Sequence, residues 1–94
     1  MEEVQKFQQE TDETYKMFAA AMQNKDNTLK EAAIKRLAES NKEMWHIENA
    51  RYFLLQLVDE IERNEVLIEA TDKQYGAGVA LYIAKTIREH YGVS

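Results

Sequence analysis

Glu43 and His46 are the two residues whose types and spacing come nearest to a chemical site. A carboxylate and an imidazole three residues apart lie one turn apart on the same side of a helix, where both can bind one metal ion. Further ligands would have to come from the first helix, whose inward positions opposite this pair are Gln8 and Thr11. We therefore interpret Glu43 and His46 as surface residues at chance spacing, and we expect no metal site and no cofactor.

The chain offers no pattern for catalysis or nucleotide binding. The absence of Cys excludes a thiol nucleophile, a thiolate metal site and disulfides. The sequence Gly76-Ala77-Gly78 lacks the third Gly and the preceding strand of a nucleotide-binding loop, so we interpret it as a hinge or a helix start. No Ser, His and acidic residue are arranged as a recognisable triad. We expect a protein that is not an enzyme and has no catalytic residues.

Aromatic and methionine side chains are abundant for a chain of this size: one Trp, five Tyr, three Phe and four Met. Tyr and Trp combine an apolar body with a polar end, and Met adapts its shape, so such side chains can line a cleft for a hydrophobic ligand. Each of them can equally be a core or rim residue, which is the commoner role. The residues that we assign to ligand binding are Phe18, Met22, Trp45, Tyr52, Tyr75 and Tyr82.

Length and charge limit the organisation of the chain and its partners. Residues 1–94 are expected to form a single helical domain. The net charge of −5 disfavours direct nucleic-acid binding, because Lys and Arg make most phosphate contacts. No apolar run is long enough to span a membrane, and the acidic first residues have the wrong charge for a signal peptide. We expect a soluble, cytoplasmic domain without membrane contact.

Apolar periodicity predicts helices through most of the chain. Residues 2–23 follow steps of four and three, which are typical of a seam between helices packed side by side. The turn-forming residues 24–27 end this helix. A second helix is predicted to begin near Leu29, because Thr28 and Glu31 have the spacing of a capping box.

Residues 29–63 allow two interpretations. Ser40 and Glu43 repeat the capping-box spacing, which would restart the helix at Ser40. The inward-facing residues between 33 and 61 nevertheless keep alternating steps of four and three without a slip, which favours one long helix with a bend near Ser40. Within it, residues 41–64 are apolar over so wide an arc that we expect several neighbours to bury this stretch.

A short helix over residues 65–70 and a last helix from Val79 complete the prediction, with residues 76–78 as the connection between them. The predicted fold class is therefore all-α: a small antiparallel helical bundle with a long central helix.

Residues 72–87, DKQYGAGVALYIAKTI, resemble the closing segment of TipAS-type antibiotic-recognition domains. In that family an Asp, a Gly, a small-apolar pair, an aromatic residue and a final apolar residue follow in this order. Residues 4–12 and 18–22 are similar to the opening helix of the family. The resemblance implies an open, globin-like arrangement of helices that binds bulky, mostly apolar antibiotics such as thiopeptides in a cleft. These domains are the effector domains of MerR-type transcriptional regulators, in which they follow a winged-helix DNA-binding region.

The chain also departs from that family. The sequence contains no DNA-binding region, so the chain alone is not expected to regulate a promoter. One extra residue lies between Asp72 and Gly78, and Ile61 stands where the family has an aromatic residue. These departures leave the identity of the ligand open.

The segments 15–19 and 43–48 have a weaker resemblance to the helical hairpin of ferritin-like di-iron proteins, which use a Glu-x-x-His pair together with a Glu from the preceding helix. The second set of ligands would be supplied only by a dimer.

The main hypothesis is a non-enzymatic domain that binds a hydrophobic, antibiotic-like small molecule. One alternative is a helical interaction module that forms a homodimer or binds a partner protein through the apolar residues of the stretch 41–64. The other alternative is a dimeric, ferritin-like metal-binding hairpin with Glu43 and His46 as ligands.

Overall fold

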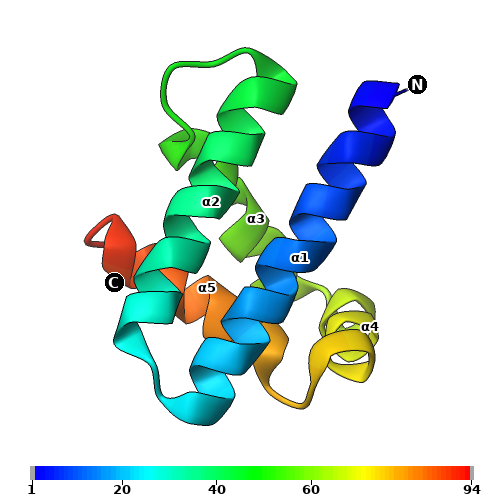
Figure 1. Ribbon diagram of the computed structural model, residues 1–94. Helices are drawn as coiled ribbons and strands as arrows, with labels where there is room; N and C mark the ends of the chain where they lie inside the picture. Colours follow the sequence, from blue (N-terminus) through cyan, green and yellow to red (C-terminus); the bar gives the residue numbers. More distant parts are fainter. Residues whose placement is uncertain (1, 94) are drawn as a thin grey trace.

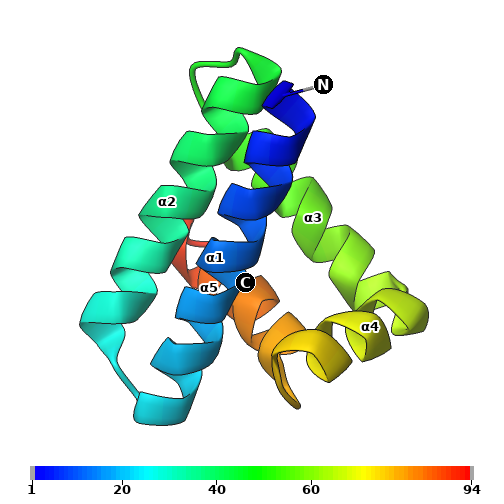
Figure 2. The same ribbon diagram turned by 45° about the vertical axis from the view of Figure 1, so that its right-hand side comes forward.

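Five helices follow one another along the chain. The computed structural model describes residues 2–93, in which the helices are α1 (Glu2–Asn24), α2 (Asn27–Trp45), α3 (Arg51–Arg63), α4 (Glu65–Tyr75) and α5 (Val79–His90). Helices α1 and α2 lie side by side as a hairpin, α5 lies behind the pair, and α3 leads away from α2 to α4 (Figures 1 and 2). The predicted all-α class is confirmed. None of the helices in the described residues is long and apolar enough to cross a membrane.

The long central helix predicted for residues 29–63 is wrong, and so is a restart at Ser40. The chain leaves α2 at His46, whose backbone is left-handed with φ 53° and ψ 50°, and the next helix begins at Arg51. Ser40 lies inside α2, where its hydroxyl donates a hydrogen bond of 3.1 Å to a carbonyl three residues earlier. The apolar pattern does not reveal the break, because α2 and α3 both pack their apolar residues against one core and the periodicity continues across the connection.

Helix α2 begins at Asn27 and is capped by Asp26 rather than by Thr28. The Asp26 Oδ1 accepts a hydrogen bond of 3.0 Å from the backbone N–H of Leu29, one of the donors left unpaired at a helix start. Asn64 caps α4 in the same way. An acidic or amide side chain therefore sets the start of each of these helices.

Helix α5, rather than the stretch 41–64, is the element that the other helices surround. It packs against each of the other four helices. Its buried residues are Val79, Ala80, Ile83, Ala84, Thr86 and Ile87. The carboxylate of Asp72 fixes the start of α5, because it accepts hydrogen bonds from the backbone N–H groups of Gly78 at 3.0 Å and Ala80 at 2.9 Å.

Arg36 of α2 holds α1 in place through two acidic side chains. Its guanidinium donates to both carboxylate oxygens of Glu10, each at 2.9 Å, and to Glu13 at 2.6 Å. The hydrogen bonds from Arg36 lower the pKa of Glu10 below its usual value. Glu10 and Glu13 lie outside the core and pair α1 with α2 along the rim of the hairpin.

Candidate functional site

Four aromatic side chains from three helices form a surface group, which we call the outer aromatic cluster: Phe7, Trp45, Tyr52 and Phe53. The Trp45 and Phe53 rings are stacked, with centroids 6.0 Å apart and planes inclined by 6°. Phe7 meets Trp45 edge-on at 6.4 Å, and Tyr52 meets Phe53 edge-on at 5.8 Å. The exposed fractions are 49% for Trp45, 67% for Tyr52 and 39% for Phe53. A large area of aromatic surface is therefore in contact with water.

The break between α2 and α3 creates this cluster. Trp45 is the last residue of α2, whereas Tyr52 and Phe53 lie in the first turn of α3. The backbone N–H groups of His46 and Ile47 both bond to the carbonyl of Lys42, which closes the end of α2. A continuous helix would have carried Trp45 and Phe53 to places more than two turns apart along its axis. The reversal of the chain allows their rings to stack instead.

A small hollow adjoins the outer aromatic cluster, between the first half of α1 and the second half of α2. Its volume is about 160 Å³, and Phe7 belongs to both the hollow and the cluster. The charged residues that line it are three carboxylates and one ammonium, from Glu3, Glu10, Glu43 and Lys6. Glu10 forms an ion pair with Arg36, whereas Glu3 and Glu43 have no ion-pair partner among the described residues. The hollow is therefore acidic.

A second aromatic group packs around the buried ring of Phe18. We call it the inner aromatic cluster, and it comprises Tyr15, Phe18, Tyr75 and Tyr82. Phe18 is fully buried and meets Tyr15 and Tyr82 edge-on at 6.5 and 6.4 Å. Tyr15 meets Tyr75 at 5.4 Å. The four rings join α1, α4 and α5.

Asp12 fixes the inner aromatic cluster at its edge. The hydroxyl of Tyr75 donates a hydrogen bond of 2.7 Å to Asp12 Oδ1, and Lys16 pairs with Oδ2 at 3.1 Å. These two contacts lower the pKa of the Asp12 carboxyl, with the hydrogen bond from Tyr75 as the larger cause. Burial, followed by the contact with Asp12, raises the pKa of the Tyr75 hydroxyl. The hydrogen bond from Tyr75 to Asp12 therefore helps to hold the Tyr75 ring against Tyr15.

The six residues that the sequence assigns to ligand binding do not share one cleft. Trp45 and Tyr52 belong to the outer aromatic cluster. Phe18, Tyr75 and Tyr82 belong to the inner aromatic cluster, and Met22 lies with Tyr82 along a different hollow near the α1–α2 turn.

Phe7 and Phe53 are the cluster members that the assignment from sequence missed. Phe7 lies near the start of α1, and antiparallel packing of α1 and α2 brings this part of α1 opposite the end of α2, where Trp45 lies. Phe53 depends on the helix break, which the apolar pattern does not reveal.

Glu43 and His46 do not share a helical face, because His46 lies at the left-handed C-cap of α2 rather than within it. Both side chains are exposed. Across residues 2–93, no three His, Asp or Glu side chains are gathered closely enough to hold a metal ion together.

Comparison of the chain with protein-family models, curated proteins and solved structures finds no match.

Proposed function

We propose that this protein is a non-enzymatic binding module whose ligand is a bulky, hydrophobic small molecule with planar rings. The observation that carries the proposal is the outer aromatic cluster, in which Trp45 and Phe53 are stacked and half-exposed rather than buried. The resemblance of residues 72–87 to antibiotic-recognition domains supports the same class of ligand.

Two contributions favour binding of such a ligand: release of water from apolar surface and contact between aromatic rings. Covering exposed apolar area contributes about 25 cal/mol per Å², and planar rings add stacking and edge contacts that a flexible apolar chain does not make. A ligand ring laid against Trp45 or Phe53 extends a stack that already exists in the free protein. Because little rearrangement is needed, little of the binding energy is lost.

The size of the adjoining hollow determines how the ligand lies. A volume of about 160 Å³ is smaller than the pockets of about 300–1,000 Å³ that enclose drug-sized ligands. The ligand therefore lies over the outer aromatic cluster and places one substituent in the hollow beside Phe7. This pose contacts α1, α2 and α3 together, so the ligand stabilises the first half of α1, where Phe7 resides.

Thermal-shift measurement with thiopeptide antibiotics tests the proposal. A ligand that binds only the folded form raises the melting temperature, because it stabilises that form by a free energy that grows with the logarithm of its concentration above Kd. We expect such a rise for the wild type and for Leu81→Ala, which removes an equally exposed apolar side chain on α5. Trp45→Ala should abolish the rise. No rise with any compound, or the same rise in all three proteins, would contradict the proposal.

A partner protein is the second candidate ligand, and the shallow shape of the site favours it. Tyr, Trp and Phe are enriched at protein interfaces, where a few aromatic residues supply most of the binding energy. A homodimer through the same surface would bring Glu3 and Glu43 toward their copies, so a partner with basic residues around an apolar face fits better. Light scattering tests the homodimer. A monomer at every concentration would exclude the homodimer, and the protein-partner candidate would then require a different protein.

A further inference from the structure

A larger hollow lies at the opposite end of the α1–α2 hairpin. Its volume is about 340 Å³, and it lies between the α1–α2 turn and α5. The apolar part of its lining comes from Ala21, Met22 and the ring of Tyr82. Met22 is fifteen residues from Phe7 along α1, which corresponds to about 22 Å along the helix axis. The two hollows are therefore separate sites.

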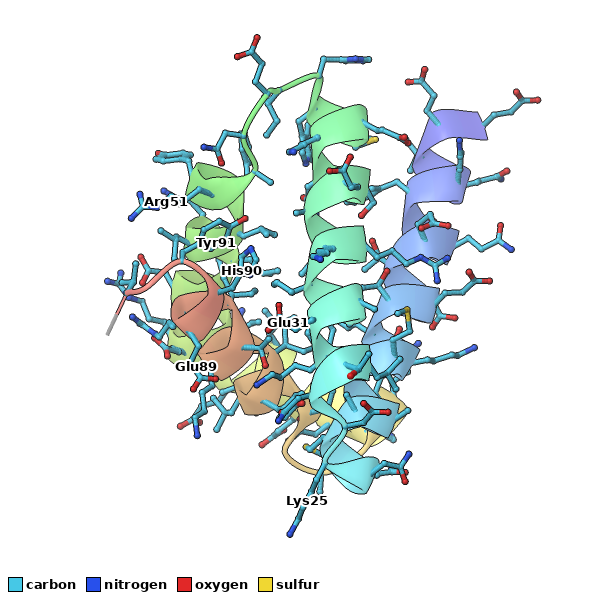
Figure 3. The ribbon with its side chains drawn as sticks, turned by 60° about the vertical axis from the view of Figure 1, so that its left-hand side comes forward. Lys25, Glu31, Arg51, Glu89, His90 and Tyr91 are labelled. Atoms are coloured by element: carbon cyan, nitrogen blue, oxygen red, sulfur yellow. The ribbon has the colours of Figure 1, made fainter. Side chains whose placement is uncertain are left out.

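Three lysines surround this hollow: Lys25 from the turn, Lys30 from α2 and Lys85 from α5. None of their ammonium groups has an ion-pair or hydrogen-bond partner anywhere in residues 2–93. Glu89 is the single carboxylate in the lining. Figure 3 shows Lys25 extending from the turn and Glu89 on α5.

The neighbouring acid Asp26 does not neutralise these lysines by pairing with them. Its carboxylate caps α2 by accepting the N–H of Leu29. The surplus of positive charge is notable because the whole chain has a net charge of −5. Like charges from three separate elements repel one another unless an anion lies between them.

We propose that this basic hollow binds an amphipathic organic anion, that is, one carboxylate, sulfonate or phosphate group on a small apolar body. The apolar body would lie against Met22 and Tyr82, and the lysines would surround the anionic group. Lysine ammonium groups suit this role because their flexible stems allow them to close around a point of negative charge. The volume lies in the range of pockets that enclose small organic ligands.

The apolar lining distinguishes this ligand from a free inorganic anion. Phosphate alone would gain the charge contacts but would cover none of the apolar surface of Ala21, Met22 and Tyr82. A neutral apolar compound would gain the burial but leave three ammonium groups unpaired. Both parts of the ligand are therefore required.

The probe for the experiment is 1-anilinonaphthalene-8-sulfonate, with N-phenyl-1-naphthylamine as its uncharged analogue. The test variant is Lys25→Gln/Lys30→Gln/Lys85→Gln. The control variant, Lys16→Gln/Lys35→Gln/Lys73→Gln, has the same net charge but changes lysines outside this hollow. Far-UV circular dichroism confirms that both variants are folded. Titrations are followed by probe fluorescence and by the amide NMR shifts of the protein.

We expect the sulfonate to shift the amide signals of residues 21–30 and 82–89 in the wild type. Its affinity should fall by about tenfold or more in the test variant and by less than about twofold in the control, because only close charges interact strongly in water. The uncharged analogue should bind the wild type more weakly than the sulfonate does.

Three results would overturn the proposal. The first is equal loss of sulfonate affinity in both triple variants, which would mean a long-range charge effect only. The second is an uncharged analogue that binds as tightly as the sulfonate at the same residues. The third is displacement of the sulfonate by inorganic phosphate at equal concentration, which would remove the role of the apolar body. Binding at the outer aromatic cluster is read from different amide signals, so either site can fail without the other.

Discussion

The two aromatic clusters are both built mainly from Phe and Tyr, yet one packs around a fully buried ring and the other faces water. The inner aromatic cluster has Phe18 fully buried at its centre, and Asp12 accepts a hydrogen bond from the hydroxyl of Tyr75 at its edge. In the outer aromatic cluster the rings contact one another, and no side-chain hydrogen bond holds Trp45 or Tyr52 among the described residues.

Aromatic side chains beside the 46–50 connection are exposed, whereas those packed around Phe18 are wholly or partly buried. Tyr15 and Phe18 lie within α1, and Tyr82 lies on α5, which the other helices surround. Tyr75 is the last residue of α4, and Asp12 accepts the hydrogen bond from its hydroxyl. Trp45, Tyr52 and Phe53 lie at helix ends beside the 46–50 connection, where no further helix covers them. We therefore propose that Tyr15, Phe18 and Tyr75 of the inner aromatic cluster serve stability and that the outer aromatic cluster serves binding of the hydrophobic ligand. Tyr82 packs against Phe18 and also lines the basic hollow.

The largest expected effect is that of Phe18→Ala. A fully buried phenyl ring that is replaced by a methyl group leaves a cavity, and the free energy of unfolding should fall by about 3–5 kcal/mol. Urea denaturation measures this loss. A loss below about 1 kcal/mol would break the comparison, because Phe18 would then be no more important for stability than a surface ring.

Gly76→Ala tests the turn that follows Tyr75, at the edge of the inner aromatic cluster. Gly76 has φ 133° and ψ 150°, a region that side chains with a Cβ avoid, and the strain should cost about 1–3 kcal/mol. Steric crowding is not the cause, because the nearest atom to an added Cβ would be Val79 Cγ2 at 3.6 Å. Gly92→Ala is the matched comparison: its φ of 68° lies in the left-handed region that other residues sometimes adopt, so its loss of stability should be smaller than that of Gly76→Ala.

Tyr75→Phe tests the polar edge of the inner aromatic cluster and its dependence on pH. The pKa of Asp12 is lower in the folded protein than in the unfolded chain, so this contact stabilises the fold above the unfolded pKa and is lost as pH falls through the folded pKa. The variant should be less stable than the wild type near neutral pH, and the difference should shrink below about pH 4. Urea melts across this pH range measure it. Tyr52→Phe, which removes an exposed hydroxyl, should show no such difference, and a gap that stayed constant with pH would exclude Asp12 as the partner that matters.

The smallest expected effect on stability is that of Tyr52→Ala. With two thirds of the side chain exposed, truncation should change the free energy of unfolding by less than about 0.5 kcal/mol. The same variant should weaken ligand binding, because the ring is part of the outer aromatic cluster. A large loss of stability would show that the outer cluster is structural and would remove the distinction between the two groups.

Much of the fold follows from the sequence, because helical periodicity is a local property. The first helix, predicted over residues 2–23, ends at Asn24, and the last helix begins at Val79 as predicted. Leu54, Val58 and Ile61, which the pattern places on an inward stripe, are buried.

The break between α2 and α3 and the aromatic clusters could not be predicted from apolar periodicity. A five-residue connection at 46–50 leaves the apolar residues on both sides in contact with the same core, so the count of steps of three and four continues across it. Asn49 offered the one local signal: its Oδ1 accepts the N–H of Arg51 at the start of α3. The stack of Trp45 on Phe53 exists only because of that break, and the grouping of aromatic residues into two clusters could not be read from spacing alone.

We propose that the outer aromatic cluster binds a hydrophobic ligand, and the fluorescence of Trp45 reports on this binding. Trp45 is the only Trp in the chain, so its emission reports on this cluster without interference from another indole. Titration with a thiopeptide antibiotic should change the emission in a saturable way in the wild type and in Leu81→Ala. The ligand concentration at half-saturation should rise by about tenfold or more when Phe53→Ala removes the stacked partner. An emission that stays constant up to the solubility limit of the compound, in protein that remains folded, would contradict the claim.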